Sequence, residues 1–149
     1  MANAKIDLLG PSDFDLVARM YNQVFHPARD GAFFKRRFLA RYNSLILVAT
    51  LDNEPVGFAL GMELKPTVFY AWLLGVLPSF RRTGVGSQLM DAMCAWAHER
   101  GYESIRLECQ NRHRAMLHMV IDRKFDVAGL RWDPDRGENL VIFEKMLGE

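Results

Sequence analysis

Hydrophobic positions recur at two spacings along the chain and divide it into segments of two kinds. Apolar residues at every second position, or in short unbroken runs, predict strands at residues 5–10, 44–51, 56–64, 67–78, 104–110, 125–132 and 139–147. Apolar residues three and four positions apart predict helices at residues 11–25, 32–43, 84–100 and 112–124. The resulting order, β-α-α-β-β-β-α-β-α-β-β, is typical of an α/β (α+β) fold in which helices pack on a mixed sheet.

Turn and capping residues mark the ends of several segments. Ser12 is a candidate cap for the first helix, Asp52–Pro55 predict a hairpin turn, and Gly101 ends the helix at 84–100. The strand at 67–78 is almost continuously apolar, so we expect it to be central and covered on both faces. The residues expected to face inward from the last two helices are Val85, Leu89, Met93 and Trp96, followed by Leu117, Val120 and Ile121.

Composition narrows the class of protein. A length of 149 residues with 50% hydrophobic content predicts one domain over residues 1–149. The net charge of +1 gives no overall attraction to nucleic acid or to an anionic membrane. The longest apolar run, residues 68–77, is about half of the ~20 residues that a membrane span needs, and we expect no leader peptide. Cys94 and Cys109 form no CxxC pair, which favours a reducing compartment, the cytoplasm.

The segment between the strand at 67–78 and the helix at 84–100 has the chemistry of a phosphate site. A helix start presents unpaired backbone N–H groups and the positive end of the helix dipole, which together favour an anion. The segment supplies glycines that let a phosphate approach the backbone, two arginines and two hydroxyls, namely Gly84 and Gly86, Arg81 and Arg82, and Thr83 and Ser87. The alternative is a glycine-containing loop with two solvated arginines.

Other phosphate and metal motifs do not fit. The NTPase loop ends in Gly-Lys-Ser/Thr, whereas Gly86 is followed by Ser87 and Gln88. The dinucleotide pattern GxGxxG fails because Leu89 occupies its third glycine position. The four histidines are scattered, and no metal-ligand spacing occurs, so we expect no metal. A nucleotide-binding protein is therefore the disfavoured alternative.

The same segment resembles a known family. It matches the acyl-CoA-binding pattern V-x-P-x-[FY]-R-x-x-G-x-G of the GNAT superfamily of N-acetyltransferases at six positions, Val76, Pro78, Phe80, Arg81, Gly84 and Gly86. The resemblance implies a mostly antiparallel sheet of about seven strands with about four helices. It also implies acetyl-CoA-dependent transfer of an acetyl group directly to a primary amine of a small molecule or peptide. A non-catalytic acyl-CoA-binding or sensing module is the alternative.

The resemblance also assigns roles to individual residues. The pyrophosphate of coenzyme A would lie on the residues Arg81, Arg82, Thr83, Gly84, Val85, Gly86 and Ser87. The pantetheine arm would pair with the strand residues Leu74, Gly75 and Val76, because a strand whose neighbour diverges leaves backbone groups free for its two amides. The Val76 backbone N–H would be the oxyanion donor, and Asn111 matches the asparagine that follows the next strand in the family.

The helix at 112–124 departs from the family pattern. It contains no tyrosine, although family members usually have one there as the acid for the departing thiolate, and Lys124 replaces a glycine. His118 lies near the expected position and could serve as the acid. Candidate bases are Glu63, Glu108 and Tyr70, and strand alternation would put Tyr70 on the same side as Trp72, Leu74 and Val76. Cys109 as a covalent nucleophile is disfavoured, because it has no nearby paired base in sequence.

The acceptor stays open at this stage. In the family, the first two helices and the last strand pair frame it. Here the arginines Arg36, Arg37 and Arg41 would favour an acidic acceptor, whereas Asp133, Asp135 and Glu138 would favour a basic one. Trp72 and Trp132 could line an apolar pocket, although aromatic residues in strands usually belong to the core. An exposed final strand could also pair with a second copy in a homodimer.

Overall fold

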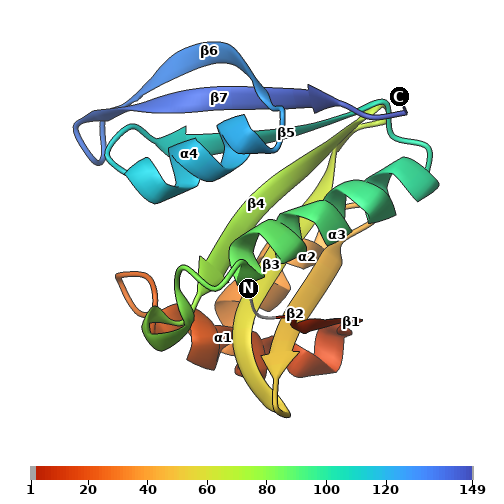
Figure 1. Ribbon diagram of the computed structural model, residues 1–149, viewed down its shortest axis with the longest axis vertical. Helices are drawn as coiled ribbons and strands as arrows, with labels where there is room; N and C mark the ends of the chain where they lie inside the picture. The colour runs from red at the N-terminus through yellow and green to blue at the C-terminus, as the bar shows by residue number, and fades with distance from the viewer. Residues whose placement is uncertain (1–2, 149) are drawn as a thin grey trace.

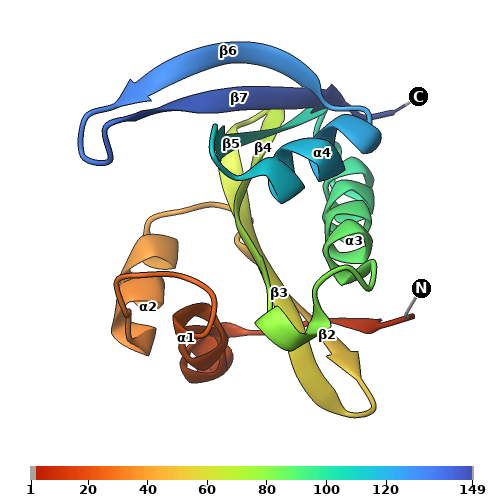
Figure 2. The ribbon, with the colours of Figure 1, turned by 60° about the vertical axis from the view of Figure 1, so that its left-hand side comes forward.

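The computed structural model describes residues 3–148, except for the side chain of Leu39, and it contains one seven-stranded sheet with helices on both faces (Figures 1 and 2). The strands are β1 (Lys5–Leu8), β2 (Leu45–Leu51), β3 (Glu54–Lys65), β4 (Val68–Val76), β5 (Ser104–Gln110), β6 (Asp126–Asp133) and β7 (Glu138–Met146). The helices are α1 (Phe14–Asn22), α2 (Gly31–Leu39), α3 (Val85–Glu99) and α4 (Arg114–Asp122), with short 3₁₀ turns at Pro11–Asp13 and Pro78–Phe80. The predicted order of elements is confirmed.

The sheet has the order β1-β2-β3-β4-β5-β7-β6. Every neighbouring pair is antiparallel except β4 and β5, which are parallel. Strand β4 therefore occupies the middle of the sheet, as its continuous apolar run predicts. The turn between β2 and β3 contains Asp52 and Asn53, both with φ in the left-handed region, at 50° and 66°. Asp and Asn tolerate that conformation better than most residues, and the predicted hairpin is confirmed.

The two faces of the sheet carry separate hydrophobic clusters. Helices α1 and α2 cover one face and α3 and α4 the other, as Figure 2 shows from the side. The α1–α2 cluster includes Phe34 and Phe58, and the α3–α4 cluster includes Phe69 and Leu89, all with fully buried side chains. Because each helix presents an apolar stripe to the sheet, burial of these side chains stabilises the three-layer arrangement.

Three local expectations are wrong. Helix α1 begins at Phe14, beyond Ser12, and the carboxylate of Asp13 accepts a hydrogen bond from the Gly10 N–H at 3.1 Å. Helix α2 ends at Leu39, earlier than its apolar spacing suggests, and the Asp30 side chain caps its start. Ile121 lies on the outer side of α4 with 55% of its surface exposed, because α4 covers only part of the sheet face.

Strand β4 contains a bulge in its middle. Leu73 pairs with Leu60 on β3, and Ala71 pairs with the next residue, Gly61, which leaves Trp72 as one extra residue in β4. A bulge of this kind reverses the alternation of side chains between the two faces of the strand.

The bulge separates residues that simple alternation would place together. Tyr70 and Trp72 pack against the α1–α2 cluster, whereas Leu74 and Val76 pack against the α3–α4 cluster. The expectation that these four residues share one side of the strand is therefore wrong. As a result, the even-numbered residues of β4 face the α1–α2 side before the bulge and the α3–α4 side after it.

Candidate active site

Strands β4 and β5 diverge soon after they begin. They pair only through Val68–Tyr70 on β4 and Ser104–Arg106 on β5, although β4 continues to Val76 and β5 to Gln110. Figure 1 shows the two strands separating beyond this point. The resemblance implies such a splay, because an extended amide ligand needs strand backbone that no neighbour occupies.

The backbone at the end of β4 faces this gap. The Leu77 N–H donates to the carbonyl oxygen of Val56 on β3 at 2.8 Å. Successive N–H groups of an extended strand point in opposite directions, so the Val76 N–H is directed away from β3 and into the gap. The Val76 carbonyl accepts a hydrogen bond from Arg81 Nε at 3.3 Å, which ties the arginine loop to the strand end. The role of the Val76 N–H as oxyanion donor, which the resemblance implies, stays a prediction.

The loop before α3 has the geometry of an anion site. Gly84 adopts φ 89°, a left-handed conformation that glycine accepts without strain, and it precedes the first turn of α3. The Thr83 hydroxyl donates to the Phe80 carbonyl, so it is occupied within the loop. Arg81 and Arg82 are exposed. The loop therefore offers two exposed guanidinium groups, one of them tied to β4 through its Nε, beside the unpaired N–H groups of a helix start.

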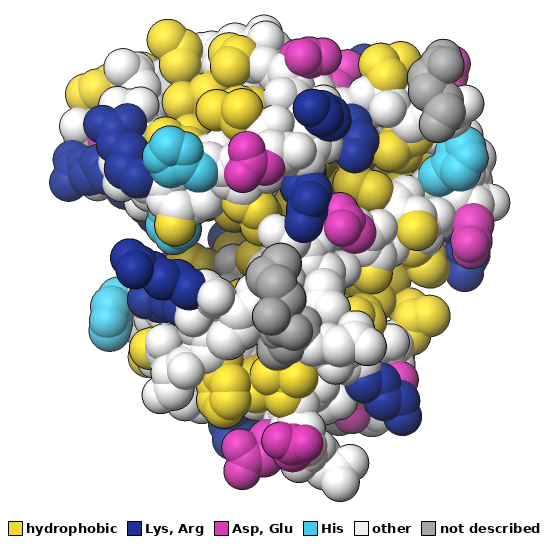
Figure 3. Space-filling model, in the orientation of Figure 1, with side chains coloured by type: hydrophobic (Ala, Val, Ile, Leu, Met, Phe, Trp, Pro, Cys, Tyr) yellow, Lys and Arg dark blue, Asp and Glu magenta, His cyan; other side chains and the backbone are white. Residues whose placement is uncertain are grey.

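Gly86 brings three elements together. A Cβ at this position would lie 3.5 Å from the Met119 sulfur of α4 and 3.7 Å from both Leu74 and Val76 of β4. The neighbouring Val85 side chain is buried, so only its backbone is available to a ligand, and Gly75 is buried against Phe58. Figure 3 shows a hollow between α4 and the loop before α3, with basic side chains over that loop.

Residues of the α4 region lie at the outer side of this hollow. Asn111 is exposed, and its backbone N–H donates to the carbonyl of Asn139 at 3.2 Å. His118 is exposed on α4, whereas Val120 is fully buried and Met119 is the residue that meets Gly86. The sequence did not single out Met119, since an apolar residue on a helix carries no chemical signal. His118 is exposed and has no resolved partner in the described part of the chain, so its role as the acid stays a prediction.

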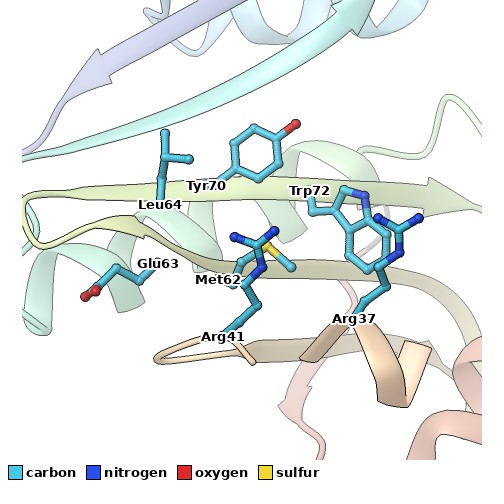
Figure 4. A pocket seen from close by; sticks show the side chains of 7 residues that line it. All are labelled: Arg37, Arg41, Met62, Glu63, Leu64, Tyr70 and Trp72. Carbon is cyan, nitrogen blue, oxygen red and sulfur yellow. The ribbon is translucent and has the colours of Figure 1, made fainter. Parts of the chain in front are cut away.

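A second hollow lies on the opposite face of the sheet. It has a volume of about 240 Å³ and is lined by residues of α2, β3, β4 and the segment after α2, namely Arg37, Arg41, Met62, Glu63, Leu64, Tyr70 and Trp72. Figure 4 shows the two arginines reaching from the α2 side toward the β4 side chains, while the Glu63 carboxylate lies at the other end. Tyr70 is also the last β4 residue paired with β5, so this pocket adjoins the point where the strands separate.

Tyr70 lies near a charged pair on the outer strands. Arg131 of β6 binds the Glu108 carboxylate through two hydrogen bonds of 3.1 and 2.9 Å. Burial raises the pKa of Tyr70 to about 12, the charge of Glu108 adds to the rise, and that of Arg131 opposes it. The phenol is therefore protonated at neutral pH and suits a hydrogen-bond donor better than a base.

Glu63 is held by a small network that the sequence did not suggest. The Tyr102 hydroxyl donates to Glu63 Oε1 at 2.8 Å and accepts a hydrogen bond from Asn43 Nδ2 at 2.6 Å. These three residues are far apart in the chain, so no local pattern could have linked them. Of the two carboxylates predicted as candidate bases, Glu63 lines the pocket, whereas Glu108 forms an ion pair with Arg131.

The structure gives no support for a nucleophilic cysteine or, within its described residues, for a metal site. Cys94 and Cys109 are buried free thiols, and burial raises the pKa of each to about 11. A protonated buried thiol is a poor nucleophile, in agreement with the packing role expected for Cys109. Within residues 3–148, no group of three or more His, Cys, Asp or Glu side chains is arranged to hold a metal ion. No helix in this part of the chain is long and apolar enough to cross a membrane.

Comparison with known proteins assigns the family. The sequence model of the Acetyltransferase (GNAT) family matches residues 14–121, which span α1 to α4 and include the splay and the arginine loop. The chain belongs to the GNAT acetyltransferase family. An uncharacterized N-acetyltransferase of Archaeoglobus fulgidus is 29% identical to this acetyltransferase over 102 residues, which cover 59% of this chain and 69% of the archaeal one.

Solved structures share the fold of this acetyltransferase. The ribosomal-protein-S18-alanine N-acetyltransferase of Escherichia coli has a TM-score of 0.85 at 17% identity, over 99% of this chain and 96% of the other. Ard1 of Thermoplasma volcanium has a TM-score of 0.82 at 24% identity, over 99% and 100%. The yncA protein of Salmonella typhimurium, solved with its cofactor acetyl-CoA, has a TM-score of 0.81 at 15% identity, over 99% and 96%. The predicted α/β fold is thereby confirmed.

Proposed function

We propose that this acetyltransferase uses acetyl-CoA to acetylate a primary amine of a small molecule or peptide directly. The observation that carries the proposal is the divergence of β4 from β5 beside the start of α3, which leaves strand backbone and helix N–H groups facing one hollow. We also propose the cytoplasm as its compartment, because Cys94 and Cys109 are both free thiols.

The residues around the hollow fit coenzyme A. The backbone of Leu74–Val76 would pair with the two pantetheine amides, and the N–H groups of Gly84–Ser87 would bind the pyrophosphate. Arg81 and Arg82 would neutralise the phosphate charge, since both are exposed beside the helix start. The apolar surface of Met119 beside Gly86 suits the methylene groups of the pantetheine arm.

The catalytic proposal rests on positioning and electrostatics. Bound acetyl-CoA supplies the acetyl group as a thioester. The Val76 N–H, directed into the gap, would stabilise negative charge on the carbonyl oxygen. We take the hollow of about 240 Å³ as the acceptor pocket. Glu63, the carboxylate that lines it, would act as the base, and the amine proton would pass to it through water. The thiolate would take its proton from solvent or from the exposed His118, because α4 has no tyrosine.

A non-catalytic acyl-CoA-binding or sensing module is the second candidate function. The absence of a tyrosine from α4 favours it, because the resemblance implies that a tyrosine there is the usual acid for the thiolate. Both candidates require the same donor site and differ only in turnover.

Ligand binding and turnover together test the proposal. We expect acetyl-CoA to raise the melting temperature of the protein and ATP, which lacks pantetheine, to leave it unchanged. We expect CoA release, followed with a thiol reagent, when a panel of primary amines is added. No shift with acetyl-CoA would contradict the donor assignment, whereas a shift without CoA release from any amine would favour the binding module.

A further inference from the structure

The acceptor pocket of about 240 Å³ contains two guanidinium groups at adjacent positions. Arg37 lies in the last turn of α2 and Arg41 lies four residues later, where the backbone N–H of Arg41 still donates to the Phe38 carbonyl at 3.1 Å. Residues four apart on a helical path lie on the same side, so both side chains reach the same hollow. Figure 4 shows them directed toward Met62, Tyr70 and Trp72.

Neither guanidinium group is neutralised within the described part of the chain. The ion pairs there involve other arginines and Lys5, and none places a carboxylate within 4.0 Å of Arg37 or Arg41. Arg37 is held instead by aromatic faces, 5.0 Å from the Phe33 ring centre and 5.9 Å from that of Trp72. Its charge is thereby oriented in the pocket and available to an incoming anion.

The carboxylates that would favour a basic acceptor lie outside the pocket lining. Asp133 accepts a hydrogen bond from the Asp135 N–H at 3.1 Å and lies 3.9 Å from Arg136. Glu138 lies 3.6 Å from Arg112. None of these acidic residues lines the pocket, where Glu63 is the one carboxylate and is hydrogen-bonded by Tyr102. The pocket lining therefore carries a net positive charge, two guanidinium groups against one carboxylate.

We infer that the acceptor is a small molecule in which an anionic group, a carboxylate or a phosphate, lies a few bonds from the primary amine, and that Arg37 and Arg41 bind this group. The inference rests on the proposed function, because it takes the pocket beside the splay as the acceptor site. A volume of about 240 Å³ is small beside the roughly 300–1,000 Å³ of drug-sized ligand sites, which favours a small acceptor over a peptide. The anion on Arg37 and Arg41 leaves the amine free to reach the gap beyond Tyr70.

Matched acceptors test the inference with the whole enzyme. The L-amino acids, β-alanine and γ-aminobutyrate are each compared with their own carboxamide, and phosphoethanolamine is compared with ethanolamine, by CoA release at saturating acetyl-CoA. We expect kcat/KM for the preferred anionic acceptor to exceed that of its neutral partner by about tenfold or more, since hydrogen bonds to charged groups are the stronger ones. The comparison with carboxamides tests for a carboxylate, and the comparison of phosphoethanolamine with ethanolamine tests for a phosphate.

Arg41→Gln removes one guanidinium group and leaves a shorter, neutral polar side chain. We expect it to raise the KM of the anionic acceptor by about tenfold and to leave the neutral amine and the KM of acetyl-CoA nearly unchanged. Arg37→Gln should act in the same direction, although it also loses packing on Trp72. Lys35→Gln is the matched control, because it removes one positive charge from an exposed position of α2 outside the pocket. Melting temperatures show whether each variant is folded.

Several outcomes would overturn the inference. Equal or better turnover of the neutral partners would do so, as would an Arg41→Gln effect no larger than that of Lys35→Gln. Turnover of peptides but of none of these small acceptors would also reject it. If acetyl-CoA does not bind at all, the proposed function itself fails, and this result is distinguished by the melting-temperature measurement with acetyl-CoA alone.

Discussion

At Tyr70, burial raises the pKa of a phenol that lines the proposed acceptor pocket. Its pKa is raised from 10.0 to about 12, so the neutral form persists throughout the physiological range. A tyrosine is visible in the sequence, but its burial and the approach of Glu108 depend on β5 and β6, which are distant in the chain. The sequence could therefore suggest Tyr70 as a site residue without indicating whether it acts as a base or as a donor.

This shift predicts how stability responds to alkaline pH. The unfolded chain releases the Tyr70 proton near pH 10 and the folded chain near pH 12, so the folded state binds more protons between these values. The free energy of unfolding should accordingly fall as pH rises from about 10 to about 12, by about 2 kcal/mol from this residue. Urea denaturation of the wild type and of Tyr70→Phe at several pH values measures the difference. We expect a smaller fall in the variant.

Tyr42→Phe provides the control for this experiment. Tyr42 is 78% exposed, so its removal should leave the alkaline loss of stability unchanged. An equal fall in wild type and Tyr70→Phe would show that the phenol is not buried as described.

At the scale of elements, strand β4 carries most of the site, and its bulge decides which residues reach each face. The order of strands and helices could be predicted because hydrophobic spacing is a local property of each segment. The bulge at Trp72 could not, because an extra residue is defined only by the register with β3. Simple alternation therefore placed Leu74 and Val76 on the wrong face, although the resemblance assigned both to the strand that pairs with pantetheine.

The proposed donor site requires an open first turn of α3. Gly86→Val would place branched methyl groups toward Met119, Leu74 and Val76, where a Cβ alone is already in contact. We expect the variant to fold and its Kd for acetyl-CoA to rise by about tenfold or more, a loss of about 1.4 kcal/mol. Isothermal titration calorimetry measures the affinity.

Gly129→Val is the matched control for that substitution. Gly129 lies on β6, where a Cβ would have only Ile142 within 4 Å, at 3.8 Å. The affinity of the Gly129→Val variant for acetyl-CoA should equal that of the wild type. An unchanged Kd in Gly86→Val would mean that the hollow beside Gly86 is not the donor site.

On the scale of the whole molecule, the sheet separates two hollows and the splay between β4 and β5 connects them. The proposed donor side could be predicted from one continuous stretch, Val76–Gly86, because a helix start and its loop are contiguous in sequence. The acceptor side could not, since Arg41, Glu63 and Tyr70 meet only after α2, β3 and β4 pack together. The sequence contains both the arginines and the opposing carboxylates of the β6–β7 hairpin. Only the fold shows that the arginines line the pocket and that these carboxylates do not.

The central claim is that acetyl-CoA binds along the end of β4 and the start of α3. Backbone ¹H–¹⁵N NMR spectra of the labelled protein, recorded during titration with acetyl-CoA, test it most directly. We expect saturable shifts in the amides of residues 74–76 and 82–87, while those of α1, on the opposite face of the sheet, stay in place. Saturable shifts confined to α1 and α2, or no saturable shift at any concentration of acetyl-CoA, would contradict the account.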